Sequence, residues 1–127
     1  MFNEFILMLL ENAEQTITLN ELIANLDNEP EQYIMDMFNS NDYDIPLTIK
    51  YRDPSDLLVS DKPIKEWVND LNKRAKNYVS DWQKRIRFGE IPPIILSDNR
   101  ILDGCHRAMA HYLAGENVPY VDIHDLP

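Results

Sequence analysis

The chain has 127 residues, a formal net charge of −10 and one cysteine, a length that allows one domain with a core and a small appendage. One cysteine excludes an internal disulfide, and no apolar run approaches the roughly 20 residues that span a bilayer. We therefore expect a cytoplasmic protein with no membrane contact. The apolar start MFNEFILMLL carries Glu4 and no basic residue, so we interpret it as a helix face rather than a secretion signal.

The negative charge belongs to the first part of the chain. Residues 1–49 hold ten of the 22 acidic residues and none of the 12 basic ones, whereas residues 50–127 hold 12 of each. Such asymmetry predicts two parts with different roles. We place an acidic three-helix extension at residues 1–43 and the main domain at residues 44–127.

The extension has the signals of three short helices. Residues 2–14 carry an apolar stripe, Thr18 and Glu21 have the capping-box spacing, and a proline begins a third segment. The arrangement resembles a helix-turn-helix unit, but the third segment offers Glu31 and Asp36 where DNA phosphates need Lys or Arg. We favour a bundle that packs on the main domain or binds a protein partner.

The main domain alternates strand and helix signals. We expect an α+β fold with a small mixed sheet. Its elements are a strand at 45–52, a loop at 53–63, one long helix or two consecutive helices at 63–88, a hairpin of strands at 94–96 and 101–103, a helix at 105–115 closed by a glycine, and a last strand at 118–123.

Residues 73–87 form a basic stretch with six Lys or Arg side chains against Asp81. Tyr78 and Trp82 lie within it and are able to stack on bases. We favour a solvated helix face with Trp82 in the core. The alternatives are docking against the acidic helices, or nucleic-acid contact through Lys84, Arg85 and Arg87.

The stretch ILDGCHRAMAHYLAG, residues 101–115, offers the clearest chemistry. Gly104 allows a sharp turn from strand to helix, and the start of a helix favours an anion. His106 and Arg107 suit phosphate oxygens, and the same field favours the thiolate of Cys105. The alternatives are an ion pair of Arg107 with Asp103 or another carboxylate, a His106 that simply caps or packs, and a buried, inert Cys105.

The remaining histidines do not form a metal site with these residues. His111 follows His106 by five positions rather than four, so the two do not share a helix face, and we expect His111 to be structural. His124 is expected to be solvated. With one cysteine and three scattered histidines, no zinc pattern is present, and we predict no protein metal site.

A longer run around the Gly104 turn resembles the core of the ParB/sulfiredoxin superfamily: PPIILSDNRILDGCHRAMAHYLAGENVPYVDI, residues 92–123, with a weaker match back to about residue 44. The pattern consists of a strand, a turn and a second strand, then Gly-x-x-Arg-x-x-Ala at the start of a helix, then a glycine and a Val-Pro pair before a last strand. Gly-Cys-His-Arg is the form seen in sulfiredoxins, which reduce cysteine sulfinic acid with ATP and magnesium. Other members bind CTP or phosphorylate free serine.

The resemblance implies roles for the residues of the turn. Cys105 matches the sulfiredoxin nucleophile, Gly104 the preceding glycine, and His106 and Arg107 the phosphate contacts. Asp103 stands where sulfiredoxins have a second glycine. In kinase-like members an acidic residue helps hold magnesium or acts as a base, and the resemblance implies such a role for Asp103. The implied cofactors are ATP or CTP with Mg²⁺.

Turn and resemblance together predict a nucleotide-binding protein. The enzymatic hypothesis is an ATP- and magnesium-dependent phosphotransferase, either sulfiredoxin-like or kinase-like, with chemistry at Cys105 or Asp103. Two alternatives stay open: a ParB-like DNA-associated regulatory or nuclease module, and a non-catalytic interaction domain that binds a partner through its acidic helices.

Overall fold

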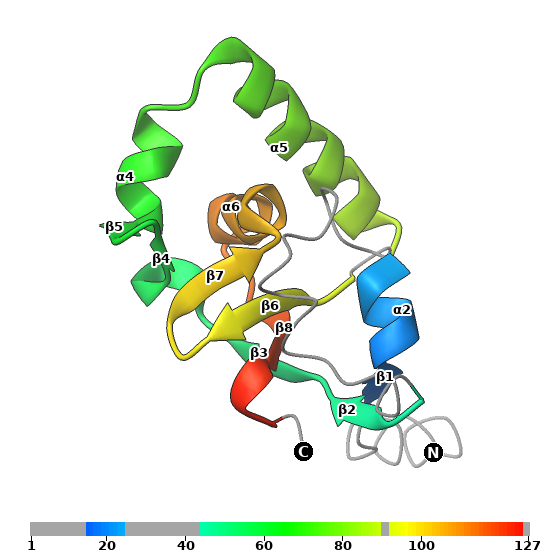
Figure 1. Ribbon diagram of the computed structural model, residues 1–127. Coiled ribbons are helices and arrows are strands. Elements are labelled where there is room, and N and C mark those ends of the chain that lie inside the picture. The colour runs from blue at the N-terminus through cyan, green and yellow to red at the C-terminus, as the bar shows by residue number, and fades with distance from the viewer. Residues whose placement is uncertain (1–14, 25–43, 90–91, 126–127) are drawn as a thin grey trace, which may run out of the picture.

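Residues 15–24, 44–89 and 92–125 of the chain are described by a computed structural model (Figure 1). Its helices are α2 (Leu19–Ala24), α4 (Ile64–Asn69), α5 (Lys73–Arg87) and α6 (Cys105–Ala114), with short 3₁₀ turns η2 (Pro54–Asp56) and η3 (Ile123–Asp125). The strands are β1 (Thr16–Thr18), β2 (Pro46–Thr48), β3 (Lys50–Arg52), β4 (Leu58–Val59), β5 (Lys62–Pro63), β6 (Ile94–Ser97), β7 (Arg100–Asp103) and β8 (Val118–Asp122). The predicted helices at 2–14 and after residue 30 lie outside the described residues.

Six of the strands form one mixed sheet in the order β3-β8-β6-β7-β4-β5. The pairs β6–β8 and β4–β7 are parallel, and the other neighbours are antiparallel. β1 and β2 form a separate antiparallel pair. The predicted α+β class with a small mixed sheet is confirmed. The predicted hairpin is β6–β7, whose two-residue turn includes Asp98 in the left-handed region, at φ 56°.

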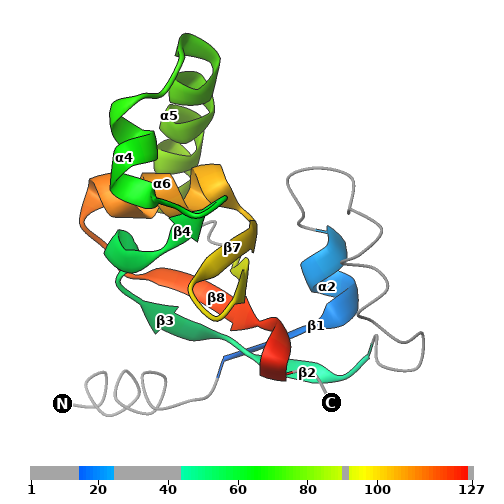
Figure 2. The ribbon, with the colours of Figure 1, turned by 60° about the vertical axis from the view of Figure 1, so that its left-hand side comes forward.

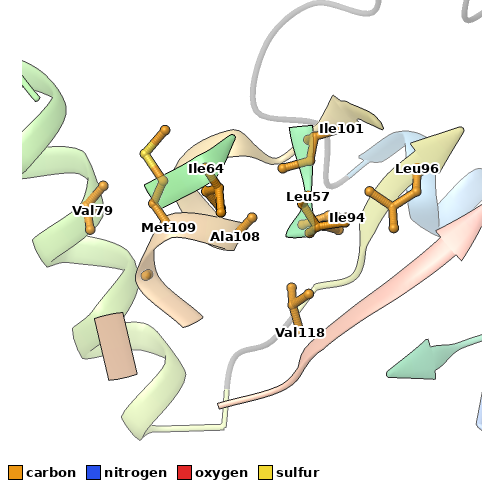
Figure 3. Packing of buried hydrophobic residues seen from close by; sticks show 10 residues of the cluster. Leu57, Ile64, Val79, Ile94, Leu96, Ile101, Ala108, Met109 and Val118 are labelled. Carbon is orange, nitrogen blue, oxygen red and sulfur yellow. The ribbon is translucent and has the colours of Figure 1, made fainter. Parts of the chain in front are cut away.

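The sheet is covered by apolar residues on both faces, because side chains alternate along each strand. Ile94 and Leu96 of β6 face the main cluster beneath α4, α5 and α6, where Val79 and Met109 also lie (Figure 3). Ile95 faces the opposite side, where a second cluster holds residues of β1, α2 and β2. Figure 2 shows α4, α5 and α6 on one side of the sheet and α2 with the β1–β2 ladder on the other.

The helices over the main cluster follow from their own residue patterns. α5 begins at Asn72, whose Oδ1 accepts a hydrogen bond from the N–H of Ala75 at 2.8 Å, and it turns Val79, Trp82 and Ile86 toward the cluster. α6 buries Ala108 and Ala110, whose small side chains permit close packing on the sheet. Of the two alternatives for residues 63–88, two consecutive helices are present. No described helix is long and apolar enough to cross a membrane.

The N-terminal half departs from the expected elements. The strand predicted at 45–52 is divided into β2 and β3, which belong to different sheets, and the loop predicted at 53–63 contains η2, β4 and β5. The sequence did not indicate β1, which lies in the extension expected to be helical and pairs Thr16 with Thr48. The capping box is confirmed, since Glu21 N–H donates to Thr18 Oγ1 at 3.3 Å and Thr18 N–H to Glu21 Oε1 at 3.4 Å. The division at residue 44 stays a prediction.

Candidate functional site

The strand-to-helix turn at Gly104 is built around a backbone conformation that favours glycine. Gly104 is the N-cap of α6, has φ 96° and lies directly after the last residue of β7, Asp103. A β-carbon at this position would meet Ile94 Cγ2 at 2.5 Å and Arg107 Nη2 at 3.1 Å. Both the dihedral angle and the space therefore require a residue without a side chain. No side chain caps α6, so the positive end of its dipole meets the turn itself.

Arg107 holds this turn together from inside. Its side chain is 2% exposed, and its Nη1 donates to the carbonyl oxygens of Pro92 and Pro93 at 3.1 and 3.0 Å. Its Nη2 donates to Asp103 Oδ2 at 2.8 Å. The guanidinium also lies 5.2 Å from the centre of the Trp82 ring. One buried cation thus joins the entry to β6, the end of β7 and α5.

The structure contains one of the two roles that the sequence indicated for Arg107, the ion pair with Asp103. The carboxylate of Asp103 is only 10% exposed, so the pair is largely withdrawn from water. A buried pair of this kind depends on each partner, because removing one leaves the other charge without compensation. Phosphate contact by Arg107, and magnesium or base chemistry at Asp103, stay predictions.

Cys105 and His106 follow the turn in the first turn of α6, and both are half-buried. The ring of His106 lies 5.4 Å from the ring of Tyr78 on α5, tilted by 32°. Cys105 packs against the edge of the main apolar cluster. The turn therefore brings Asp103, Gly104, Cys105 and His106 together at one helix end, with an aromatic ring of α5 beside it.

The last turn of α5 carries the three cations proposed for nucleic-acid contact. Lys84, Arg85 and Arg87 are exposed. Arg85 lies 4.0 Å above the ring of Trp82, which Arg107 also contacts. Trp82 is half-buried against the main cluster, as the favoured interpretation of this stretch expected. The proposed docking of this stretch on the acidic helices involves residues outside the described part.

The two remaining histidines differ sharply in burial. His111 is 3% exposed within α6, and its Nδ1 has no hydrogen-bond partner among the residues that the structure describes. The side chain of His124 is 59% exposed and lies 3.3 Å from Ser97 Oγ and 3.7 Å from Asp98 Oδ2. In the described part of the chain, no group of three or more His, Cys, Asp or Glu side chains is arranged to hold a metal ion.

Burial of His111 is expected to make folding stability fall as the pH is lowered. Burial lowers the pKa of His111 below its usual 6.5, opposed by the charge of Glu116 and assisted by Arg107. The unfolded chain then takes up a proton more readily than the folded one, so the contribution is complete above pH 6.5 and is lost as the pH falls through the folded pKa.

Urea unfolding at pH 7.5, 6.5 and 5.5 tests this expectation. A His111→Gln variant should flatten the dependence on pH, whereas His124→Gln, at an exposed position, should leave the wild-type slope unchanged. Equal slopes in the wild type and the His111 variant would contradict the assignment.

The sequence predicted the Gly104 turn but not the backbone carbonyls and the aromatic ring that hold Arg107 in place there. The carbonyl oxygens of Pro92 and Pro93 accept the Arg107 hydrogen bonds, and Trp82 covers its guanidinium. An ion pair of Arg107 with Asp103 or another carboxylate was one of the alternatives that the sequence offered, and the structure contains the pair with Asp103. The partners from α5 and the Pro-Pro segment come from elsewhere in the chain, and no local pattern indicates them.

Comparisons with known proteins give no family for this chain. No family model matches it, and no curated protein and no solved structure matches it either.

Proposed function

We propose that the protein binds a nucleotide, with the phosphate groups at the Gly104 turn. The observation that carries this proposal is the start of α6, which has no side-chain cap and follows β7 directly. Gly104 connects the two elements, and the space around it is too small for any side chain. Helix starts approached through a glycine turn are general binding places for phosphate oxygens. The resemblance of residues 92–123 to the ParB/sulfiredoxin superfamily supports the same use of this turn.

The residues around the turn divide into contact and positioning roles. His106 is half-buried at the first turn of α6 and would donate a hydrogen bond to a phosphate oxygen. Arg107, held by Asp103 and the two prolyl carbonyls, acts as a positioning residue that fixes the turn. Its positive charge still contributes to the field at the helix start, although the ion pair with Asp103 offsets much of it.

ATP or CTP with Mg²⁺ is the proposed ligand. Proteins usually bind Mg²⁺ through one or two carboxylates together with the phosphates of the nucleotide, and the ion keeps several waters. Asp103 fits such a role only in part, since its Oδ2 already accepts from Arg107. The residues of the turn therefore fit a nucleotide phosphate better than a protein-held metal ion.

The enzymatic form of the proposal is a phosphotransferase, sulfiredoxin-like or kinase-like. Cys105 lies at the positive end of the helix dipole, which favours its thiolate form. It is half-buried rather than sealed in the core, so the residue is partly accessible from solvent. Asp103 is the alternative reactive group, and it would first have to leave Arg107.

Isothermal titration with ATP, CTP and GTP, each with Mg²⁺, tests nucleotide binding. We expect heat from at least one nucleotide, and at least fivefold weaker binding by His106→Ala, because a phosphate contact is lost. His124→Ala, at an exposed position outside the turn, is the matched control and should bind like the wild type. Arg107→Ala is a poor test because the loss of its buried contacts would weaken the fold.

Two results would contradict the proposal. One is the absence of heat from all three nucleotides with folded wild-type protein. The other is binding that is weakened equally by His106→Ala and His124→Ala, which would place the ligand elsewhere.

A further inference from the structure

In the part of the chain that the structure describes, most cations of α5 differ from the other cations in forming no ion pair with a carboxylate. Six of the 12 basic residues lie outside α5, and five of these form ion pairs with carboxylates: Lys50, Arg52, Lys62, Arg100 and Arg107. Within the described part of the chain, five cations of α5 make no such pair: Lys73, Arg74, Lys76, Lys84 and Arg87. A protein of net charge −10 thus presents one concentrated positive surface.

Exposed aromatic rings lie among these cations. Tyr78 is 43% exposed and Phe88, which follows the last turn of α5, is 84% exposed. Arg74 precedes Tyr78 by one helical turn, lies 5.6 Å from its ring centre and donates to its hydroxyl oxygen at 3.2 Å. Lys84 precedes Phe88 by the same four-residue spacing. Cation and ring therefore occur in pairs at both ends of the helix.

The opposite face of α5 is already occupied. Val79, Trp82 and Ile86 pack against the main apolar cluster. A basic amphipathic helix that lies on a membrane needs a free apolar face, whereas α5 and its C-cap expose only two separate rings, Tyr78 and Phe88. An acidic peptide would use the cations and leave the rings without a role. A ligand that combines regularly spaced negative charge with flat aromatic groups uses both.

We propose that the outer face of α5 binds single-stranded nucleic acid, DNA and RNA alike. Lys73, Arg74, Lys84 and Arg87 contact backbone phosphates, and bases stack on Tyr78 and Phe88. The helix is about 22 Å long, so it contacts only a few nucleotides. This role goes beyond nucleotide binding at the Gly104 turn and does not depend on it.

The acidic residues outside α5 lower the expected affinity for single-stranded nucleic acid. They repel a polyanion, so binding relies on the local field of α5 and weakens steeply as salt is added. For a single strand, the slope of log K against log salt is about −0.7 for each phosphate contact, and three or four contacts give a slope of about −2 to −3.

Fluorescence anisotropy with a labelled 20-nucleotide oligo-dT at 50 to 200 mM NaCl tests the proposal with the full chain. Lys84→Ala/Arg87→Ala should weaken binding at 50 mM salt about tenfold and make the salt slope about 1.4 units shallower, because two phosphate contacts are lost. The matched control, Lys62→Ala/Arg100→Ala, removes the same charge from ion-paired positions and should stay within twofold of the wild type.

Stacking is tested separately by Phe88→Ala. Phe88 is almost fully exposed, so the variant should keep the melting temperature of the wild type while binding at least fivefold more weakly. An oligo-U of the same length should bind within threefold of oligo-dT.

Four results would overturn the proposal: no binding at 50 mM salt, equal losses in the two double variants, tighter binding to a 20-base-pair duplex, or co-sedimentation with anionic phospholipid vesicles in place of oligonucleotide binding. The first would leave nucleotide titration at the Gly104 turn unaffected, so the two proposals fail independently.

Discussion

An Arg107→Met variant is expected to lose about 3–5 kcal/mol of unfolding free energy, because it removes the buried cation that pairs with the Asp103 carboxylate, which is only 10% exposed. The carbonyl oxygens of Pro92 and Pro93 lose their hydrogen-bond donor at the same time. Methionine fills much of the vacated space, so the loss reports on charge and hydrogen bonding more than on a cavity. Urea unfolding followed by tryptophan fluorescence measures it, and Trp82 lies beside the changed residue.

Arg100→Met provides the matched control. Arg100 pairs with Asp61 at 2.6 Å, but its side chain is 62% exposed, so the expected loss is about 0–1 kcal/mol. A double variant, Arg107→Met/Asp103→Leu, should recover part of the loss because the buried carboxylate is removed together with its cation. Equal losses at Arg107 and Arg100, or no recovery in the double variant, would show that the buried pair is not what stabilises the turn.

Gly104→Ala is expected to lower the unfolding free energy by about 3 kcal/mol. About 1–2 kcal/mol comes from placing an L residue in the left-handed region, at φ 96°. The rest comes from the new methyl group, which would lie 2.5 Å from Ile94 Cγ2 and force β6 or α6 to move, a type of overpacking that costs about 1–3 kcal/mol. Thermal or urea unfolding of the folded protein measures the change.

Gly115→Ala separates these two contributions. Gly115 ends α6 with φ 70°, and nothing lies within 4 Å of the β-carbon that alanine would add. Its substitution should therefore lose only the backbone contribution, about 1–2 kcal/mol. If both variants lose the same amount, the contact with Ile94 is relieved without cost and the tight packing of the turn is not a constraint.

Local turn chemistry explains why the second half of the chain could be predicted. The β6–β7 hairpin, α6 with a glycine at each end, and β8 all depend on short-range signals: a polar two-residue turn, Gly104, Gly115 and the alternation of apolar residues. The asymmetric burial of β6, with Ile95 facing one cluster and its neighbours the other, follows from the same two-residue period.

Long-range pairing explains what could not be predicted. β1 and β2 are three residues each, and their pairing of Thr16 with Thr48 depends on a segment distant in sequence. Ile49 marks the point where the expected strand divides, since its N–H donates to the carbonyl oxygen of Gln15 at 2.8 Å. The alternation of apolar and polar residues along 45–52 does not indicate that its two halves pair in different sheets.

The candidate site was predictable to the extent that it is local. Glycine before a Cys-His-Arg helix start indicated the turn, and an ion pair of Arg107 with Asp103 or another carboxylate was the alternative to phosphate contact. The burial of Arg107 depends on segments that meet only in the folded chain. That Lys73, Arg74, Lys76, Lys84 and Arg87 form no ion pair with the carboxylates that the structure describes is likewise invisible in sequence, because it requires knowing which carboxylates the other cations contact.

The two outer strands of the six-stranded sheet limit its growth. β3 and β5 are three and two residues long; β5 contains Pro63, which has no N–H to donate, and β3 carries Lys50 and Arg52. Short, charged or proline-containing edges give an incoming strand few hydrogen bonds and place charge in its way. Both edge strands therefore disfavour pairing with the sheet of a neighbouring copy, which protects the protein from aggregation by strand addition.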